Sequence, residues 1–182
     1  IVKFKPFFTK IVFFLFFHMV LLLSSDIETQ PGPSLVNGFN DGFLSFCNWN
    51  INTLSKNDFQ RVPLIEAHNS IYKYDIISLC ETSLNEATKV PENFLKGYEF
   101  FSTNHPSGEK KGGVGIFYRE SLPLKIRHDL LFDECIVTEI IFGRKKIFFT
   151  VLYRNPINKV GTPEFENFFQ NFEDLYKKIK NE

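Results

Sequence analysis

The sequence predicts an α+β domain that begins near Phe43 and continues to Glu182. Several short apolar runs, rich in β-branched and aromatic residues and separated by turn-forming residues, are typical of strands. One segment near the carboxyl-terminal end repeats its apolar residues at helical spacing. Hydrophobic residues make up 43% of the chain and charged residues 23%, a balance that favours a packed core over disorder.

The predicted elements follow one another in a mixed order along this domain. A short helix is expected over Pro63–Tyr72, because proline is tolerated in a first helical turn. Gly143-Arg144 predicts a hairpin between the last two strands. The expected strands are Leu44–Ile51, Asp75–Cys80, Val114–Tyr118, Cys135–Phe142 and Lys146–Tyr153.

A second helix is expected to begin after Thr162 and to extend to Lys180. Thr162 is suited to cap the helix, and Pro163 fits its first position. Acidic residues near the start and lysines near the end suit the helix dipole. Its apolar stripe consists of Phe165, Phe168, Phe169, Phe172, Leu175, Tyr176 and Ile179.

Residues 1–25 predict an apolar leader. The run Ile11–Leu23 is apolar except for His18, follows three lysines and precedes Ser24 and Ser25. This order resembles a secretory signal peptide. A membrane-spanning helix fits less well, because these thirteen residues would span only about 20 Å of a hydrocarbon core about 30 Å thick.

Asp26, Ile27, Glu28 and Pro31–Pro33 open a segment, residues 26–42, that is expected to be a linker. Ser24–Pro33 resembles the 2A-like peptides of viruses and of some non-LTR retrotransposons, in which the ribosome skips the final Gly–Pro bond. That bond would be Gly32–Pro33 here. Gln30 stands where the family has Asn, so skipping is expected to be weak or absent. The alternative is a polar linker rich in Pro and Gly.

Charge and cysteine content set limits on the class of protein. The formal net charge is zero, so any contact with nucleic acid must come from a local patch or from sequence outside this chain. The three cysteines are odd in number and widely spaced, which disfavours a disulfide framework or a zinc site. We expect Cys47, Cys80 and Cys135 to be buried free thiols.

Polar residues at the ends of the apolar strands are the candidate functional residues. Asn50 ends one strand, and Glu81 directly follows another, where a carboxylate suits Mg²⁺. Tyr153 and Arg154 end a third strand and are suited to bind a phosphate. Each also has a simpler interpretation. Asn50 would be part of an Asn-rich strand exit, Glu81 a solvated acid at the start of a loop, and Tyr153 a residue at the edge of the core before a turn. The glycine-rich run Gly112–Arg119 opens a strand, which disfavours a phosphate-binding loop.

The order of these segments resembles the endonuclease/exonuclease/phosphatase family. The four segments are Trp-Asn-Ile-Asn at 49–52, Leu-Cys-Glu-Thr-Ser-Leu at 79–84, Gly-Gly-Val-Gly-Ile-Phe-Tyr-Arg at 112–119 and Leu-Tyr-Arg-Asn-Pro at 152–156. They most resemble the apurinic-type endonuclease domains of non-LTR retrotransposons (LINE elements). The resemblance covers residues 43–182 and implies a DNase I-like fold, in which two packed β-sheets are flanked by helices.

The resemblance also implies an activity and roles for individual residues. The family hydrolyses phosphodiester bonds with a divalent cation, Mg²⁺ or Mn²⁺. Glu81 and Asn50 are implied to bind that metal. Asn50 and Tyr153 are implied to be catalytic residues, with Tyr153 beside the scissile phosphate. Arg154 is implied to contact the DNA backbone. The implied partners are DNA and a reverse transcriptase encoded downstream.

The sequence lacks two further motifs of the family, Gly-Asp-x-Asn and Ser-Asp-His. We therefore expect an amino-terminal part of the domain, incomplete and inactive on its own. Two alternatives stay open, namely another phosphatase or phosphodiesterase of the superfamily and a secreted non-catalytic module. The compartment is also open, because a retrotransposon nuclease acts in the nucleus whereas the leader is signal-like.

Overall fold

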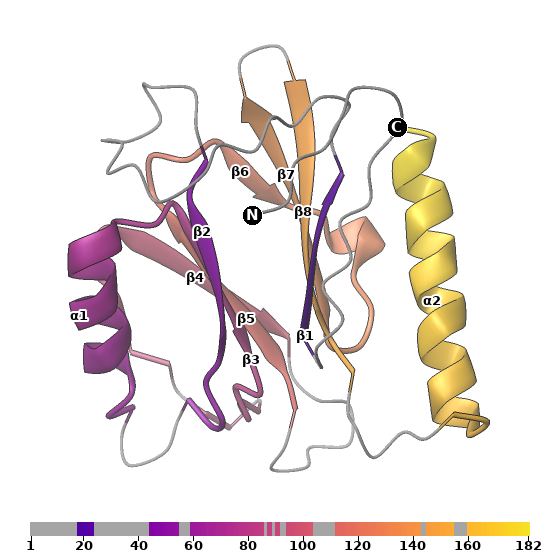
Figure 1. Ribbon diagram of the computed structural model, residues 1–182, viewed down its shortest axis with the longest axis horizontal. Coiled ribbons are helices and arrows are strands. Elements are labelled where there is room, and N and C mark those ends of the chain that lie inside the picture. The colour runs from indigo at the N-terminus through magenta and orange to yellow at the C-terminus, as the bar shows by residue number, and fades with distance from the viewer. Residues whose placement is uncertain are drawn as a thin grey trace.

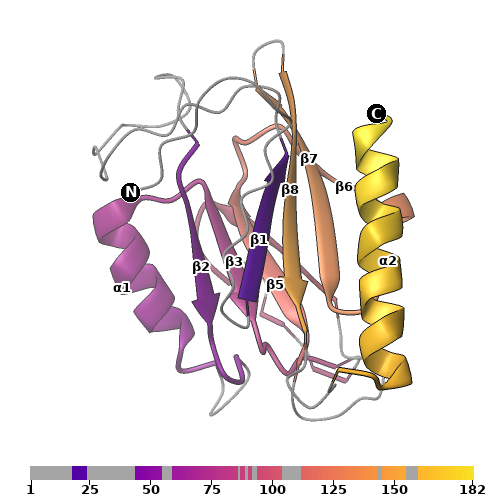
Figure 2. The ribbon, with the colours of Figure 1, turned by 45° about the vertical axis from the view of Figure 1, so that its right-hand side comes forward.

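Two four-stranded sheets pack face to face between two helices, with α1 outside one sheet and α2 outside the other (Figures 1 and 2). The computed structural model describes residues 18–23, 44–54, 59–85, 87–88, 90–91, 94–103, 112–142, 145–154 and 160–182. The two sheets with their flanking helices confirm the predicted α+β sandwich.

The first sheet has the strand order β2-β3-β5-β4. β2 and β3 are parallel, and the other neighbours are antiparallel. A parallel pair needs a crossover connection, and helix α1 (Val62–Tyr72) lies between these two strands in the sequence. The strands are β2 (Phe46–Asn50), β3 (Ile76–Cys80), β4 (Tyr98–Thr103) and β5 (Val114–Arg119).

The second sheet has the order β1-β8-β7-β6 and is antiparallel throughout. A short 3₁₀ helix, His128–Leu130, follows β6. Phe142 pairs with Lys145, as the predicted hairpin requires, although its turn residues lie outside the described part of the chain. The strands are β1 (His18–Leu23), β6 (Leu124–Ile126), β7 (Cys135–Phe142) and β8 (Lys145–Tyr153).

β1 comes from the segment that the sequence predicts to be a leader. His18–Leu23 pairs with β8, so that His18 lies opposite Tyr153 and Leu23 opposite Phe148. The rest of the predicted leader and the whole 2A-like motif lie outside the described residues. In the part of the chain that the structure describes, no helix is both long and apolar enough to cross a bilayer.

The central core lies between the sheets. Ile76 and Ile116 of the first sheet belong to the same buried cluster as Ile136, Phe149 and Val151 of the second. Two further clusters join each sheet to its helix, one through Ile65 of α1 and the other through Leu175 and Ile179 of α2. The side chains on both faces of β3 are therefore buried, which explains its continuous apolar sequence.

Helix α2 (Pro163–Lys180) is the predicted carboxyl-terminal helix. The backbone N–H of Phe165 donates to the Thr162 hydroxyl at 3.3 Å, which confirms the predicted cap. The apolar stripe packs against β7 and β8 through buried Leu175 and Ile179, whereas Phe169 is 45% exposed.

Arg127 links the end of α2 to the second sheet. Its guanidinium donates to Asp129 at 2.8 and 2.9 Å and to Glu139 at 2.8 Å, and it also pairs with Glu182. The same group lies over the Phe148 ring at 5.6 Å. Hydrogen bonds from Arg127 lower the pKa of Asp129 to about 2 and also lower the pKa of Glu182.

Replacing Arg127 with Met is expected to lower the free energy of unfolding at neutral pH by roughly 2–3 kcal/mol, because Glu139 loses a buried partner. The part of the effect that comes from Asp129 depends on pH, because folding depresses the pKa of Asp129 from 3.8 to about 2; this part is present above pH 3.8 and is lost as the pH falls toward 2. Urea unfolding at several pH values should therefore show wild type and variant converging in acid. The exposed pair Lys177–Glu173 supplies the control, since Lys177→Met should change stability little. A difference that persists undiminished in acid would contradict this role.

Candidate active site

Asn50 and Glu81 meet at the carboxyl ends of the parallel strands β2 and β3. Asn50 lies opposite Cys80 in the register, so Glu81 follows at the same edge of the sheet. The Asn50 Nδ2 donates to the Glu81 Oε1 at 2.9 Å, and the Asn50 Oδ1 accepts from the backbone N–H of Asn52 at 3.0 Å. The carboxamide is thereby fixed with its nitrogen toward Glu81.

Tyr153 reaches the same carboxylate from the second sheet. It is the last residue of β8, is only 3% exposed, and its hydroxyl donates to Glu81 Oε1 at 2.9 Å. One carboxylate oxygen thus accepts hydrogen bonds from Asn50 and from Tyr153, and neither bond uses Oε2. The three side chains join the two sheets at one end of the sandwich.

The phenol of Tyr153 is held in its neutral form. Burial raises its pKa above the ordinary value of 10, and the hydrogen bond to the Glu81 carboxylate raises it further. Tyr153 therefore stays a proton-bearing donor at neutral pH, aimed at the carboxylate that ends β3.

The backbone around Glu81 is left-handed and tightly held. Glu81 has φ 56° and Ser83 φ 52°, a region that few residues other than glycine adopt. Thr82 N donates to Gly113 O at 3.2 Å, and Ser83 N donates to Gly112 O at 2.8 Å. Strained backbone of this kind persists only where neighbouring contacts fix it, and it is concentrated at functional sites.

The glycine-rich run behaves as a strand opening, as the sequence predicts. Gly112 and Gly113 have φ 110° and 80°, and β5 begins at Val114. Their carbonyls hold the segment after Glu81. Glycine is needed here because both residues lie in the positive-φ region that side chains disfavour.

Arg154, the fourth predicted site residue, contacts helix α2. Its guanidinium carbon sits 5.6 Å from the centre of the Phe165 ring on α2. This is a cation–π contact with the first turn of the helix. The predicted contact with DNA remains a prediction.

The sequence profile of the endonuclease/exonuclease/phosphatase family matches residues 47–179, which include all four candidate residues. The chain belongs to this family. No curated protein matches the chain closely enough to count as a relative.

Solved structures share the fold of this family member. The endonuclease domain of TRAS1, a telomere-specific non-LTR retrotransposon, has a TM-score of 0.52 and 16% identity, over 74% of this chain and 54% of that domain. The 3′ phosphatase NExo from Neisseria, bound to a product DNA hairpin, has a TM-score of 0.52 and 16% identity, over 76% of this chain and 52% of that one. The chain therefore spans about half the length of each.

The donor set of the site suits a hard cation. Glu81 supplies the carboxylate of the trio. Its Oε1 accepts both hydrogen bonds, and neither of these bonds involves Oε2. Mg²⁺ is often held by one or two carboxylates together with substrate phosphate and water, which fits a single well-oriented Glu. As it stands, Asn50 orients Glu81, and the ligand role predicted for its oxygen remains a prediction. Within the described residues, no group of three or more His, Cys, Asp or Glu side chains is arranged so that it could hold a metal ion.

Glu134 is a neighbour of the site that the sequence reasoning missed. It precedes β7, is 6% exposed, and its Oε1 accepts from the backbone N–H of Gly113 at 3.0 Å. Its pKa is raised to about 7, mainly by burial and also by the charges of Asp133 and Glu81, whereas the hydrogen bond from Gly113 acts in the opposite direction. An acid before an apolar strand is the only sequence signal, and such acids are usually solvated.

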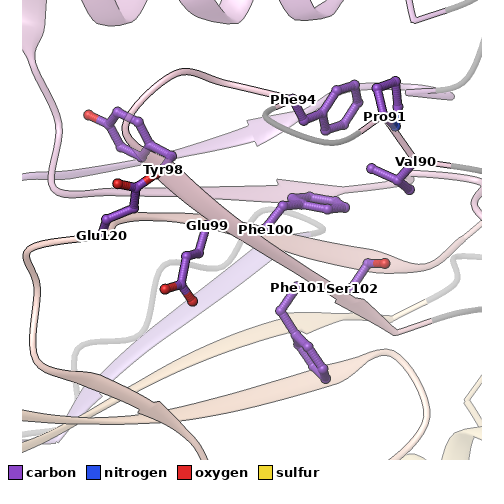
Figure 3. A pocket seen from close by; sticks show the side chains of 9 residues that line it. All are labelled: Val90, Pro91, Phe94, Tyr98, Glu99, Phe100, Phe101, Ser102 and Glu120. Carbon is purple, nitrogen blue, oxygen red and sulfur yellow. The ribbon is translucent and has the colours of Figure 1, made fainter.

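A separate hollow runs along the edge strand β4 (Figure 3). Figure 3 shows Phe100 on the side of Phe94, whereas Glu99 and Phe101 point to the other side of the strand. The lining of this hollow shares no residue with the trio Asn50, Glu81 and Tyr153.

Proposed function

We propose that this chain is the amino-terminal half of a metal-dependent phosphodiesterase, a DNA endonuclease of the non-LTR retrotransposon kind. The observation that carries the proposal is the convergence of Asn50 and Tyr153 on one oxygen of Glu81. These residues come from three strands and two sheets, and each ends its strand or directly follows one. Membership of a family of nucleases and phosphatases supports phosphodiester hydrolysis as the reaction.

Each residue of the site has a distinct part in this reaction. Glu81 would hold the Mg²⁺ or Mn²⁺ ion, and Asn50 fixes the direction of its carboxylate. When bound, the cation would polarise the phosphate and offset charge on the leaving oxygen. Neutral Tyr153 keeps its proton and is suited to donate a hydrogen bond to a phosphate oxygen that displaces Glu81 as its acceptor.

The attacking water needs a base that this sequence does not supply. The sequence contains neither Gly-Asp-x-Asn nor Ser-Asp-His, the segments that supply the base in the family. We therefore assign the base to further sequence of the parent protein, together with the loops that select a DNA target. Arg154 is assigned to the DNA backbone, and a downstream reverse transcriptase is the expected partner.

The test compares this chain with the protein extended along its reading frame beyond Glu182. We expect both missing motifs in the extension, and Mg²⁺-dependent nicking of supercoiled plasmid only by the extended protein. Glu81→Gln in the extended protein is the matched control and should abolish nicking. Nicking by the 182-residue chain alone, or an inert extended protein that carries both motifs, contradicts the proposal.

A 3′ phosphatase is a second candidate, favoured by the fold shared with NExo. The two activities separate on two substrates, since an endonuclease converts closed plasmid whereas a phosphatase releases phosphate from a 3′-phosphorylated oligonucleotide. Supply of both substrates to the same extended protein decides between them.

The retrotransposon assignment and the compartment depend on the segment before β2. Asp26, Ile27, Glu28 and Pro31–Pro33 match the 2A-like pattern, which supports a retrotransposon origin and nuclear action. The signal-like leader supports secretion, yet cleavage after Ser25 would remove the strand His18–Leu23. A reporter fused after residue 40 distinguishes ribosome skipping, secretion and retention of the leader.

A further inference from the structure

We propose that Glu134 is a positioning residue that ties Glu81 and Tyr153 into one site across the two sheets. This inference rests on the proposed function, because it concerns how the same site is held ready for metal and phosphate. Glu134 belongs to the second sheet through its place before β7, yet its side chain reaches the first sheet at Gly113.

The side chain of Glu134 acts on the segment that carries Glu81. Its Oε1 accepts from the buried N–H of Gly113 at 3.0 Å. The carbonyls of Gly113 and Gly112 in turn accept from Thr82 N at 3.2 Å and Ser83 N at 2.8 Å. One carboxylate thereby fixes the glycine pair on which the left-handed turn at Glu81 rests.

The backbone of Glu134 acts on Tyr153. Its carbonyl accepts from the Tyr153 N–H at 3.0 Å, at the end of β8. Glu134 itself has φ 57°, so its side chain and its carbonyl are directed by a strained backbone. Glu134 therefore contacts both Gly113, which holds the segment after Glu81, and the backbone of Tyr153.

Burial makes this carboxylate costly unless it has a specific task. Glu134 is 6% exposed, and burial raises its pKa to about 7. An apolar residue of similar volume would avoid that cost. An apolar residue, however, would give the buried N–H of Gly113 no acceptor. We infer that the site requires Glu134 as this acceptor.

Asp75 provides a matched control at the opposite end of β3. It is 4% exposed, its Oδ2 accepts from Ser45 N and Oγ at 2.8 Å, and its Oδ1 lies 3.2 Å from the Nε of Arg119. The carboxylates of Asp75 and Glu134 are both buried, and each accepts from a backbone amide. Asp75, however, precedes β3, whereas Glu81 follows it. Loss of the Asp75 charge tests the effect of a buried acid as such.

The experiment compares Glu134→Met, Glu134→Gln and Asp75→Asn in the 182-residue chain by nuclear magnetic resonance. Met keeps the volume and removes the acceptor, whereas the Gln carboxamide oxygen keeps the acceptor and removes the charge. The first measurement is hydrogen exchange at the amides of Thr82, Ser83 and Gly113. The second is the Mn²⁺ concentration that broadens the amide signal of Thr82.

Glu134→Met is expected to speed exchange at these three amides and to raise the required Mn²⁺ concentration about tenfold or more, as the loss of an orienting partner does elsewhere. Glu134→Gln should restore both values to near those of the wild type. Asp75→Asn should leave both unchanged, even where it lowers the melting temperature.

Unchanged exchange in Glu134→Met, or a Gln variant that behaves like Met, would overturn the inference. So would normal Mn²⁺ broadening in Glu134→Met alongside faster exchange, because the residue would then be structural only. A wild-type chain that shows no Mn²⁺ effect contradicts the proposed function instead, and the exchange data then decide whether Glu134 holds the turn.

Discussion

Replacing Glu81 with Gln is expected to weaken Mn²⁺ binding at the carboxyl end of β3 by about a hundredfold or more. The carboxamide oxygen of Gln can still accept from Asn50 and Tyr153, so the fold and the hydrogen bonds of the site are retained. What disappears is the negative charge and the anionic oxygen that a hard cation requires. The apparent affinity should fall by about a hundredfold or more, since loss of residues that merely orient a ligand already costs 10–100-fold.

The measurement is broadening of the Thr82 amide signal during titration with Mn²⁺. Glu99→Gln is the matched control. Glu99 lies on β4 and, like Glu81, accepts a hydrogen bond from a tyrosine, in this case Tyr118. The control should titrate like the wild type. Equal broadening in wild type and Glu81→Gln would show that the cation binds elsewhere and would remove the basis for the assigned site.

Replacing Phe149 with Ala is expected to produce the largest loss of stability. Phe149 is fully buried in the core between the two sheets, and its ring lies 5.4 Å from that of Phe46 in an edge-to-face contact. Removal of a buried phenylalanine leaves a cavity and typically costs about 3–5 kcal/mol. Because this core holds together the sheets that carry Glu81 and Tyr153, the site should loosen with it.

Urea unfolding followed by far-ultraviolet circular dichroism measures the expected loss. Phe169→Ala is the control with the same side chain, because Phe169 is 45% exposed on α2. Its cost should be about 1 kcal/mol or less, as for most exposed substitutions. Similar losses in the two variants would mean that the interface between the sheets is not the main core.

The strands inside the two sheets were predictable, as was the edge strand β2, whereas the edge strands β1, β4 and β6 were not. β3, β5, β7 and β8 lie inside their sheets and so carry the β-branched and aromatic runs that predict strands. β4 and β6 are edge strands that the sequence reasoning missed. β6 has only three residues, and β4 is half-buried along most of its length, so neither shows a clear alternation of apolar and polar residues.

The sequence predicts which strand ends carry polar residues but not how those residues meet. Asn50 and Glu81 are predictable as neighbours once β2 and β3 are parallel. The contact of Tyr153 with Glu81 spans 72 positions and depends on how two sheets pack. Glu134 was missed for the same reason, since its value as an acceptor arises only when β7 brings it to Gly113 of the other sheet.

The central claim is that Glu81, held by Asn50 and Tyr153, is a metal-binding carboxylate, and a crystal soaked in Mn²⁺ tests it most directly. We predict an anomalous difference peak about 2.0–2.2 Å from a carboxylate oxygen of Glu81, within the range for small divalent cations. The peak should be absent from Glu81→Gln crystals soaked in the same way. Ordered Mn²⁺ peaks at other carboxylates of the wild-type crystal, with none at Glu81, would contradict the claim.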